Sequence, residues 1–450
     1  MELYKRIRKQ DPKIYKMIQG EWDRQADGLE LIPSENYTSP AVMEAMGSIL
    51  TNKYSEGYPN RRYYGGNEFI DEIETEAIER TKKIFGVPFA NVQPYSGSPA
   101  NLAVYVATCK PGDTVMGLNL PDGGHLTHGW KYSATALFYK SVPYHVQEDG
   151  RIDMEEVRKL AHEHKPRLIW VGATAYPYLY DYKAFMEIAD EVGAFVAADI
   201  AHVAGLIVAG AHPSPVAHAH IVTTTTHKTL RGPRGGIIMT TARGIKKDAD
   251  LAQRMDKAII PGLQGGPHNH QTAAIAIALK EAATPAFKAY GKQIVKNAKA
   301  LAESLKKSGM KLVSNGTENH LILLDLVPVF GPGGGHFASD ALEVAGMTAN
   351  KNTIPKDPGS AFYPSGVRLG TPALTTRGMK EKEMKKVGEW IARAIQEASQ
   401  YRLPADTKER PAYLAKAKTE LARNKELKKI RQEIRAFCKR YPLPHLPVKR

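Results

Sequence analysis

The stretch "AFVAADIAH" (residues 194–202) is an apolar run that ends in an aspartate and a histidine. Its length and composition predict a buried β-strand. Asp199 then lies at the end of that strand, where a carboxylate is costly unless it is paired or hydrogen-bonded. Lys228 closes the next apolar run, "HIVTTTTHK" (220–228). The two stretches predict two strands, one βα step apart, that each end in a charged residue.

Two earlier runs, "DTVMGLN" (113–119) and "RLIWVGAT" (167–174), extend the same pattern. Between about residues 91 and 240, such runs alternate with helical patterns, which predicts an α/β domain with a mostly parallel sheet. Polar residues close several of these runs. Ligands of open α/β sheets bind outside the carboxyl ends of the strands, so we expect a site at that edge. The polar residues at the strand ends are Thr174, Asp199, His202 and the segment 225–228.

A second region follows a long helical pattern (271–309) that Pro285 interrupts. Beyond it, "NHLILLDL" (319–326) and "GVRLGTPALTT" (366–376) are typical of strands in a smaller α+β domain. We therefore predict three parts, which are an N-terminal helical arm (1–50), a large α/β domain (51–285) and a small C-terminal α+β domain (286–450).

The composition is that of a soluble globular protein, with 42% apolar and 24% charged residues in 450. No apolar run approaches the roughly 20 residues that span a bilayer, and the charged N-terminal segment lacks a secretory signal. We expect a cytoplasmic protein that does not enter a membrane. Cys109 and Cys438 lie far apart, so neither a disulfide framework nor a zinc site is supported.

The net charge of +15 is concentrated near the C-terminus. In the segment 412–441, Leu, Ile and Phe recur at helical spacing between lysines and arginines, which predicts an amphipathic helix with a solvated basic face. A nucleic-acid-binding patch is the alternative, but no recognised binding motif accompanies it.

Asp199 and Lys228 together suit pyridoxal phosphate. An acid that keeps the pyridine nitrogen protonated makes the ring an electron sink, and a lysine with a lowered pKa can form a Schiff base with the same cofactor. The segment "PYSGSPANLAVYVAT" (94–108) predicts a polar turn before a helix, where backbone donors hold a phosphate. In that turn, Ser98 is expected to cap the helix and Pro99 to occupy its first position.

His125 follows two glycines in "DGGHLTHG" (122–129). It lies either in an ordinary exposed loop or against the cofactor ring as a stacking partner. A metal site at His125 and His128 is not supported, because no carboxylate or third histidine lies at a useful spacing, and we predict no metal. Arg368 lies in an apolar strand, where it either grips a substrate carboxylate or forms an internal salt bridge.

The segment "NKYSEGYPNRRYYGG" (52–66) is rich in tyrosine, arginine and glycine around one acid, Glu56. Such a loop is either ordinary surface or the lining of an active site at a subunit boundary.

Seven motifs together resemble the serine hydroxymethyltransferase family, in the same order and over nearly the whole chain. They are "LIPSEN", "NKYSEGYPNRRYYGG", "DGGHLTHG", "DIAHVAGL", "VTTTTHKTLRGPRGG", "PGLQGGP" and "GVRLGTPALTTRG". The resemblance implies the large aspartate-aminotransferase-like fold of pyridoxal phosphate enzymes, with tetrahydrofolate as co-substrate. It also implies a homodimer, or a tetramer of two dimers, whose active sites are shared between subunits.

The resemblance also implies site residues at matching positions. Lys228 would form the Schiff base, Asp199 would pair with the ring nitrogen and His125 would stack on the ring. The implied cofactor contacts are Ser96, Gly97, Ser98, His125, Thr174, Asp199, His202, Thr225, His227 and Lys228, with Gly265 and Gly266 supplied by the partner subunit. The implied catalytic residues are Lys228, Glu56, Tyr64, His227 and Thr225. The implied substrate contacts are Ser34, Tyr54, Glu56, Tyr64, His202 and Arg368, and the implied folate contacts are Glu56, Leu120, Gly124, His125, Leu126, Asn352, Ser360, Ala361 and Phe362.

Three positions depart from the family pattern. Tyr95 replaces a usual histidine, Pro99 replaces a usual glutamine or alanine, and Thr174 replaces a usual serine while keeping its hydroxyl. We expect cofactor binding to persist.

The function that follows is the reversible conversion of serine and tetrahydrofolate into glycine and 5,10-methylenetetrahydrofolate. A folate-independent threonine or β-hydroxy amino acid aldolase would use the same Lys228, Asp199 and Arg368, but it would not need Glu56 or the folate positions. A basic nucleic-acid-binding protein that has lost the enzymatic role ranks lowest, because every main cofactor position is intact.

Overall fold

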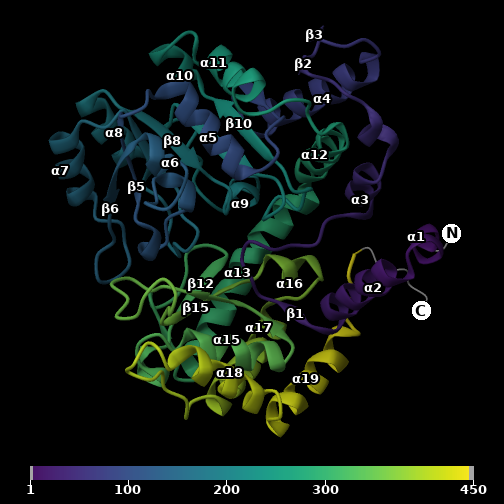
Figure 1. Cartoon of the computed structure of the whole chain (residues 1–450), viewed down its shortest axis with the longest axis vertical. Helices are drawn as coiled ribbons and strands as arrows, with labels where there is room; N and C mark the ends of the chain where they lie inside the picture. Colours follow the sequence, from purple (N-terminus) through teal and green to yellow (C-terminus); the bar gives the residue numbers. More distant parts are fainter. Residues whose placement is uncertain (1–3, 445–450) are drawn as a thin grey trace.

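A seven-stranded sheet forms the centre of the larger part of the molecule in the computed structural model, which describes residues 4–444 (Figure 1). The strand order is β4-β10-β9-β8-β7-β5-β6. Neighbouring strands are parallel except at β10, which runs antiparallel to β4 and β9. The predicted mostly parallel sheet is therefore confirmed. The strands are β4 (Phe89–Asn91), β5 (Thr114–Leu118), β6 (Lys140–Tyr144), β7 (Leu168–Val171), β8 (Phe195–Asp199), β9 (Ile221–Thr225) and β10 (Gly236–Thr240).

Both faces of this sheet are covered, which explains why its central strands are apolar without alternation. Successive residues of β7 enter different cores, because side chains alternate between the faces of a strand. Ile169 packs with helices α7 (Met154–His164) and α8 (Tyr182–Val192). Trp170 packs on the opposite face with α5 (Gly97–Thr108) and α11 (Leu251–Lys257). The polar ends of the strands are thus left at the edge between the two helical layers.

A four-stranded antiparallel sheet organises the smaller part, in the order β11-β12-β15-β14. Helix α13 (Pro285–Lys307) leads from the large sheet to this sheet, as Figure 1 shows. The same core contains Leu29 and Leu31, so the segment after the N-terminal helices packs here. The other elements are β11 (Lys311–Leu312), β12 (Leu321–Asp325), β14 (Asn350–Asn352), β15 (Gly366–Gly370), α15 (Gly335–Val344) and α17 (Glu381–Glu397).

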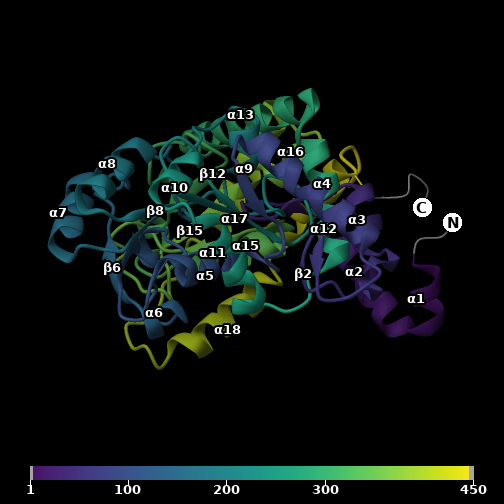
Figure 2. The same cartoon turned by 90° about the horizontal axis from the view of Figure 1, so that it is seen from above.

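The N-terminal helices lie at one end of the molecule, opposite α7 and α8 (Figure 2). Strand β1 (Leu29–Glu30) joins them to the small part by pairing in parallel with β13 (Met347–Thr348). The remaining elements are α1 (Lys5–Gln10), α2 (Pro12–Asp27), α3 (Pro40–Met46), η1 (Ile49–Asn52), β2 (Gly57–Tyr58), β3 (Arg61–Arg62), α4 (Glu68–Phe85), η2 (Leu120–Asp122), η3 (Leu126–His128), α6 (Thr135–Phe138), α9 (Ala204–Val208), α10 (Ala242–Lys247), η4 (Ala258–Leu263), α12 (Asn269–Ala282), α14 (Val327–Phe330), α16 (Pro372–Thr376), α18 (Arg410–Leu421) and α19 (Lys425–Cys438).

The domain boundaries at 50/51 and 285/286 stay predictions. The ends of the predicted outer parts, residues 1–3 and 445–450, lie outside the described residues. The predicted break at Pro285 is confirmed, since α12 ends at Ala282 and α13 begins at Pro285. Among residues 4–444, no helix has the length and apolar character needed to cross a bilayer.

Two predicted elements differ in the structure. The segment 366–376 is a strand only to Gly370, and its second half is helix α16. Pro372 explains the change, because proline suits the first turn of a helix and cannot donate within a sheet. The basic segment 412–441 forms two helices rather than one, because α18 ends at Leu421 and α19 begins at Lys425 with Asn424 as its N-cap.

Asn424 is the residue that separates these two helices. Its side chain accepts a hydrogen bond from the backbone N–H of Leu427 at 2.9 Å and donates to Glu397 at 2.9 Å. Helix α19 then buries Leu427, Ile430 and Ile434 and leaves its basic residues exposed. The predicted amphipathic pattern is therefore correct, although the helix count was wrong.

We expect Asn424→Ala to lower the free energy of unfolding by about 1 kcal/mol, because α19 loses its N-cap. Urea denaturation followed by circular dichroism measures the change. Asn424→Ser keeps an acceptor for the cap and loses only the bond to Glu397, so it should retain most of the stability. Equal losses in the two variants would contradict the capping role.

Candidate active site

One pocket collects residues from the ends of three parallel strands and from two loops. Its lining residues are Gly97, His125, His128, Ala173, Thr174, Asp199, Ala201, His202, Thr225 and Lys228. The carboxyl ends of β7, β8 and β9 meet here because the strands are parallel neighbours. Seven predicted cofactor residues are thus brought together, namely Gly97, His125, Thr174, Asp199, His202, Thr225 and Lys228.

Asp199 is held by donors on both carboxylate oxygens. Its Oδ2 accepts from Asn101 Nδ2 at 2.8 Å and from His128 Nε2 at 3.1 Å, and its Oδ1 accepts from the backbone N–H of Ala201 at 3.0 Å. Burial alone would raise the pKa of Asp199, but the hydrogen bond from His128 and the electrostatic effects of His128, His125 and Lys228 hold that pKa below its ordinary value. Asp199 is therefore an anion in a buried site.

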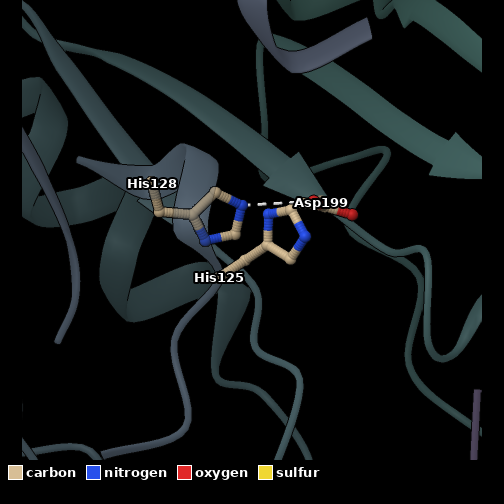
Figure 3. Close-up of side chains that lie close together, drawn as sticks. All are labelled: His125, His128 and Asp199. Atoms are coloured by element: carbon tan, nitrogen blue, oxygen red, sulfur yellow. Dashed lines mark hydrogen bonds and ion pairs between the residues drawn. The ribbon is translucent and has the colours of Figure 1, made fainter. Parts of the chain in front are cut away.

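His125 and His128 lie on one side of Asp199 (Figure 3). The pKa of His125 is lowered to about 4, chiefly by burial and then by His128, so its ring is neutral at pH 7. Its Nδ1 accepts from the backbone N–H of Thr127 at 3.3 Å and lies 2.7 Å from the hydroxyl of that residue. His128 stacks on Trp170, with ring centroids 4.9 Å apart and an angle of 9°. The side chain of Trp170 thus fixes the ring that donates to Asp199.

Folding brings a carboxylate to the two histidines, although none lies near them in sequence. Ligand atoms of His125, His128 and Asp199 all lie within 4.8 Å of one another, close enough for a metal ion to use them. The sequence argument against a metal site, that no carboxylate lies near His125 and His128, was therefore wrong in one respect. Asp199 is far from them in the chain, but it stands at the end of β8 beside them in the folded protein. Asp199 already accepts three hydrogen bonds from protein donors, and the absence of a metal stays a prediction.

Lys228 follows β9 and faces Asp199 in the same pocket. Burial lowers the pKa of Lys228 to about 8, with further lowering by Arg368 and Arg234 and an opposing effect of Asp199. The lowered pKa that was expected of this lysine is therefore due to burial and to two arginines. The pKa of His227 is itself lowered to about 3 by burial and by Lys228.

Helix α5 begins at Gly97 and points its first turn into the pocket beside Thr225. A Cβ on Gly97 would lie 2.6 Å from the Thr225 methyl carbon, so only glycine fits there. Ser96 occupies the N-cap position, which corrects the assignment of Ser98 as cap and of Pro99 as first helical residue. The Thr225 hydroxyl is buried and has no hydrogen-bond partner among residues 4–444. A free helix N-terminus and an unpaired hydroxyl fit a phosphate group.

Arg368 is 8% exposed on β15, and among the described residues it forms no ion pair with an acid. Its Nε donates to Asn350 Oδ1 at 3.1 Å and its Nη1 donates to the carbonyl of Thr174 at 2.5 Å. Burial lowers its pKa to about 10. The alternative of an internal salt bridge is thus not realised, and a buried cation is left for an anionic ligand.

Ser34 lies on the segment that connects β1 to α3. Pro33 of this segment packs closely on Gly370 at the end of β15, where a Cβ would meet it at 2.4 Å. Asn36 donates to the carbonyl of Lys228 at 2.9 Å. The segment therefore runs between the strand of Arg368 and the loop of Lys228, although the Ser34 hydroxyl forms no hydrogen bond within residues 4–444.

Glu56, Tyr54 and Tyr64 form a separate cluster that does not line the pocket of Lys228. The Tyr64 hydroxyl lies 3.5 Å from Glu56 Oε2, and the Tyr54 and Tyr64 rings meet edge to face at 5.3 Å. Gly265 and Gly266 lie against Glu56 and Tyr54, respectively. Five predicted residues are thus gathered here, away from the other predicted catalytic residues of the same chain.

The predicted folate positions fall on three loops. Leu120, Gly124, His125 and Leu126 surround η2 and η3, where a Cβ on Gly124 would lie 1.9 Å from the carbonyl oxygen of Leu118. Asn352 ends β14, and its neighbour Thr353 donates to the carbonyl of Pro121 at 2.7 Å. These two loops therefore meet. Ser360, Ala361 and Phe362 form a third, exposed loop whose contact is with His336, 3.0 Å from the Phe362 carbonyl.

Sequence reasoning missed several residues that support the site. Asn101 and His128 hold Asp199, Asn36 holds the loop of Lys228, Asn350 holds Arg368, and His320 contacts His202. Four of them stood in quoted stretches, namely His128, Asn101, Asn36 and His320, but only the metal-binding capacity of His128 was considered. None of the five carries a local signal for its role, since each contacts a residue of another element.

Comparison with known proteins agrees with the geometry. The family model for serine hydroxymethyltransferase matches residues 7–391. The chain belongs to this family. Serine hydroxymethyltransferase from Acidothermus cellulolyticus is 58% identical over 382 residues, which cover 85% of this chain and 87% of the relative. Serine hydroxymethyltransferase from Sorangium cellulosum is 56% identical over 387 residues, which cover 86% of this chain and 89% of the relative.

Membership of the serine hydroxymethyltransferase family confirms the predicted fold class and enzyme class. Enzymes of this family use pyridoxal phosphate and take tetrahydrofolate as a substrate, so the predicted cofactors are confirmed as well. The pocket fits pyridoxal phosphate on its own evidence, because it pairs a buried anion, Asp199, with an amine of lowered pKa and an unpaired buried hydroxyl. The individual roles of the site residues stay predictions.

We expect pyridoxal phosphate to attach to Lys228 faster as the pH rises, with a midpoint at about 8. The pKa of Lys228 is lowered, so the uncharged amine, which alone is nucleophilic, dominates above that pH. Borohydride trapping of the cofactor-free chain at a series of pH values, with mass spectrometry of the Lys228 peptide, measures the rate. Lys228→Ala should show no trapping at this peptide, and a midpoint near the ordinary lysine value of about 10.4 would contradict the burial of the amine.

Proposed function

We propose that this chain transfers the hydroxymethyl carbon of serine to tetrahydrofolate, giving glycine, 5,10-methylenetetrahydrofolate and water, and that it also catalyses the reverse reaction. The observation that carries the proposal is Arg368, a buried arginine without an acidic partner that reaches Thr174 of the Lys228 pocket. A planar guanidinium recognises the carboxylate of an amino acid in two-point contact. The substrate class is therefore an α-amino acid.

When it is bound, pyridoxal phosphate supplies an electron sink for negative charge that develops at the α-carbon of the amino acid. Lys228 would hold the cofactor through its side-chain amine, and Asp199 would stabilise a proton on the ring nitrogen. His125 would pack on the ring, while the first turn of α5 and Thr225 would bind the phosphate. Two neighbouring residues assist catalysis. They are His227, which precedes Lys228 in the chain, and Tyr64, which lies beside Glu56.

Glu56 moves a proton at the serine hydroxyl oxygen when the hydroxymethyl carbon leaves. Tyr64 supports this role, because its hydroxyl lies beside the Glu56 carboxylate and the charge of Glu56 raises the pKa of Tyr64. Tyr54 and Ser34 bind the substrate. The loops of Leu120 to Leu126, Asn352 and Ser360 to Phe362 receive the folate, and the contact of Thr353 with Pro121 supports their joint use.

We expect the visible absorbance of the cofactor-loaded enzyme to change strongly with glycine only when tetrahydrofolate is also present. A transferase couples the two ligands, whereas an aldolase has no use for folate. A spectrophotometric titration with glycine, with and without tetrahydrofolate, measures this dependence. Glu56→Gln serves as the matched variant and should lose at least about 100-fold in kcat for serine, as expected for removal of a general acid–base group. Indifference of the wild-type spectrum to folate would favour the aldolase alternative.

We propose further that the enzyme is a homodimer in which Glu56, Tyr54, Tyr64, Gly265 and Gly266 complete the pocket of the partner subunit. Two observations support this arrangement. The cluster around Glu56 does not line the pocket of its own Lys228. Large apolar side chains are also exposed around it, with Ile49 83%, Tyr63 75% and Phe69 69% exposed, which is unusual for a monomer surface.

Mixed dimers of Lys228→Ala and Glu56→Gln distinguish a shared site from a site within one chain. If sites are shared, each hybrid dimer holds one site with both mutations and one intact site. Random mixing should then restore about a quarter of wild-type activity, because half of the dimers are hybrids with one working site. The two variants are unfolded, refolded together and assayed with serine and tetrahydrofolate. Each variant refolded alone is the control, and no recovery in the mixture would contradict the shared site.

We place the enzyme in the cytoplasm. Cys109 and Cys438 are both free thiols in the structure, which is the usual state in a reducing compartment.

A further inference from the structure

Two buried histidines meet behind the pocket of Lys228. His202 Nδ1 lies 3.3 Å from His320 Nε2, and the side chains are only 6% and 1% exposed. His202 lines the pocket, whereas His320 stands behind it at the start of β12. The family comparison says nothing of this pair, and the proposed function gives His320 no role.

Both rings are neutral at pH 7. Burial and the neighbouring cations Lys228 and Arg368 hold the pKa of His202 well below its ordinary value, and burial together with Arg368 lowers the pKa of His320 to about 3. A neutral imidazole carries one N–H and one bare acceptor nitrogen. One of the two facing nitrogens is therefore the donor, and the choice decides what the other nitrogens can do.

The surroundings of His320 favour one of the two arrangements. Its Nδ1 is buried without a hydrogen-bond partner among the described residues. If His202 donated to His320, the proton of His320 would sit on this Nδ1 as a buried N–H without an acceptor, and such orphaned donors are rare in folded proteins. If His320 donates instead, its Nδ1 is only a bare acceptor, and the proton of His202 sits on Nε2.

We propose that His320 donates its Nε2–H to Nδ1 of His202 and thereby fixes His202 as the tautomer that donates a hydrogen bond from Nε2 into the pocket. His320 is then a positioning residue. The acceptor is an anionic oxygen, because His202 shares its surroundings with the cations Lys228 and Arg368. Arg368 already donates from Nε to Asn350 and from Nη1 to Thr174. An additional N–H donor at His202 therefore strengthens the binding of an anion beside it. The inference rests on the proposed function only in naming that oxygen, which belongs to the substrate carboxylate or to the cofactor ring.

Two substitutions of His320 separate hydrogen bonding from packing. His320→Gln places an amide N–H near the position of the imidazole Nε2, whereas His320→Met fills similar space without a donor. Both remove the ring, so a purely structural role would affect them alike. The dissociation constant of glycine, measured by calorimetry on cofactor-loaded enzyme, should rise about tenfold in His320→Met and less than about threefold in His320→Gln, as expected for the loss of one hydrogen bond to a charged group.

The tautomer itself is read by nitrogen NMR of enzyme labelled with [15N]histidine, with the His202 signal assigned by its disappearance in His202→Asn. We expect the proton of His202 on Nε2 in the wild type and in His320→Gln, and a mixture of tautomers in His320→Met. If His320→Met binds glycine more weakly, the acceptor is the substrate carboxylate. If its cofactor absorbance shifts while its glycine affinity stays unchanged, the acceptor is the oxygen of the cofactor ring.

A wild-type His202 with its proton on Nδ1 would overturn the inference. Identical behaviour of the two His320 variants in both glycine affinity and cofactor absorbance would overturn it as well. The failure of the proposed function is distinct, because it would show as a wild-type enzyme without serine and tetrahydrofolate turnover, and the tautomer spectrum is measured independently of turnover.

Discussion

The negative charge of Asp199, whose side chain is only 11% exposed, is the constraint on which the site depends. Taking a carboxylate out of water costs several kcal/mol unless donors replace the lost water. Here a side-chain amide, an imidazole and a backbone N–H replace it. Each donor needs its own support, and Asn101 is held in turn by the hydroxyl of Thr223, which donates to Asn101 Oδ1 at 2.7 Å. The threonine run of β9 thus contributes to the anion as well as to the sheet.

Three cations, Lys228, Arg368 and Arg234, lie near the single negative charge of Asp199, which cannot neutralise them all. Burial lowers the pKa values of Lys228, His227 and His202, and neighbouring cations lower them further. These cations are Arg368 and Arg234 at Lys228, Lys228 and Arg234 at His227, and Lys228 and Arg368 at His202. The charge of Asp199 opposes this lowering at Lys228. A pocket with such an excess of cations binds ligands that bring their own anionic groups, such as a phosphate and a carboxylate, and loses part of its internal repulsion when they enter.

The sequence allowed the central features of the site to be predicted, because they depend on local patterns. Apolar runs that end in Asp199 and Lys228 predict both the strands and the edge where their ends converge. Partners such as His128 and Asn36 could not be predicted in the same way, since each contacts an atom supplied by a distant strand or loop. The division of the basic C-terminal segment was missed because helical periodicity continues through Ala422 and Asn424, and only the capping geometry of Asn424 shows the break. The helix after Gly370 was missed because an apolar, threonine-rich segment favours a strand until Pro372 is weighed.

Thr174 connects Arg368 to the loop of Gly123 and Gly124. Its carbonyl accepts from Arg368, while its backbone N–H and hydroxyl donate to the carbonyls of Gly123 and Gly124 at 2.7 Å and 2.9 Å. The guanidinium of Arg368 and the loop of Gly123 and Gly124 are therefore hydrogen-bonded to different groups of the same residue. The N–H and the carbonyl of Thr174 belong to the two successive peptide groups on either side of its Cα. The position of the Arg368 guanidinium is thus set relative to the loop of Gly123 and Gly124 by the backbone and hydroxyl of one residue, without any direct bond between the arginine and the loop.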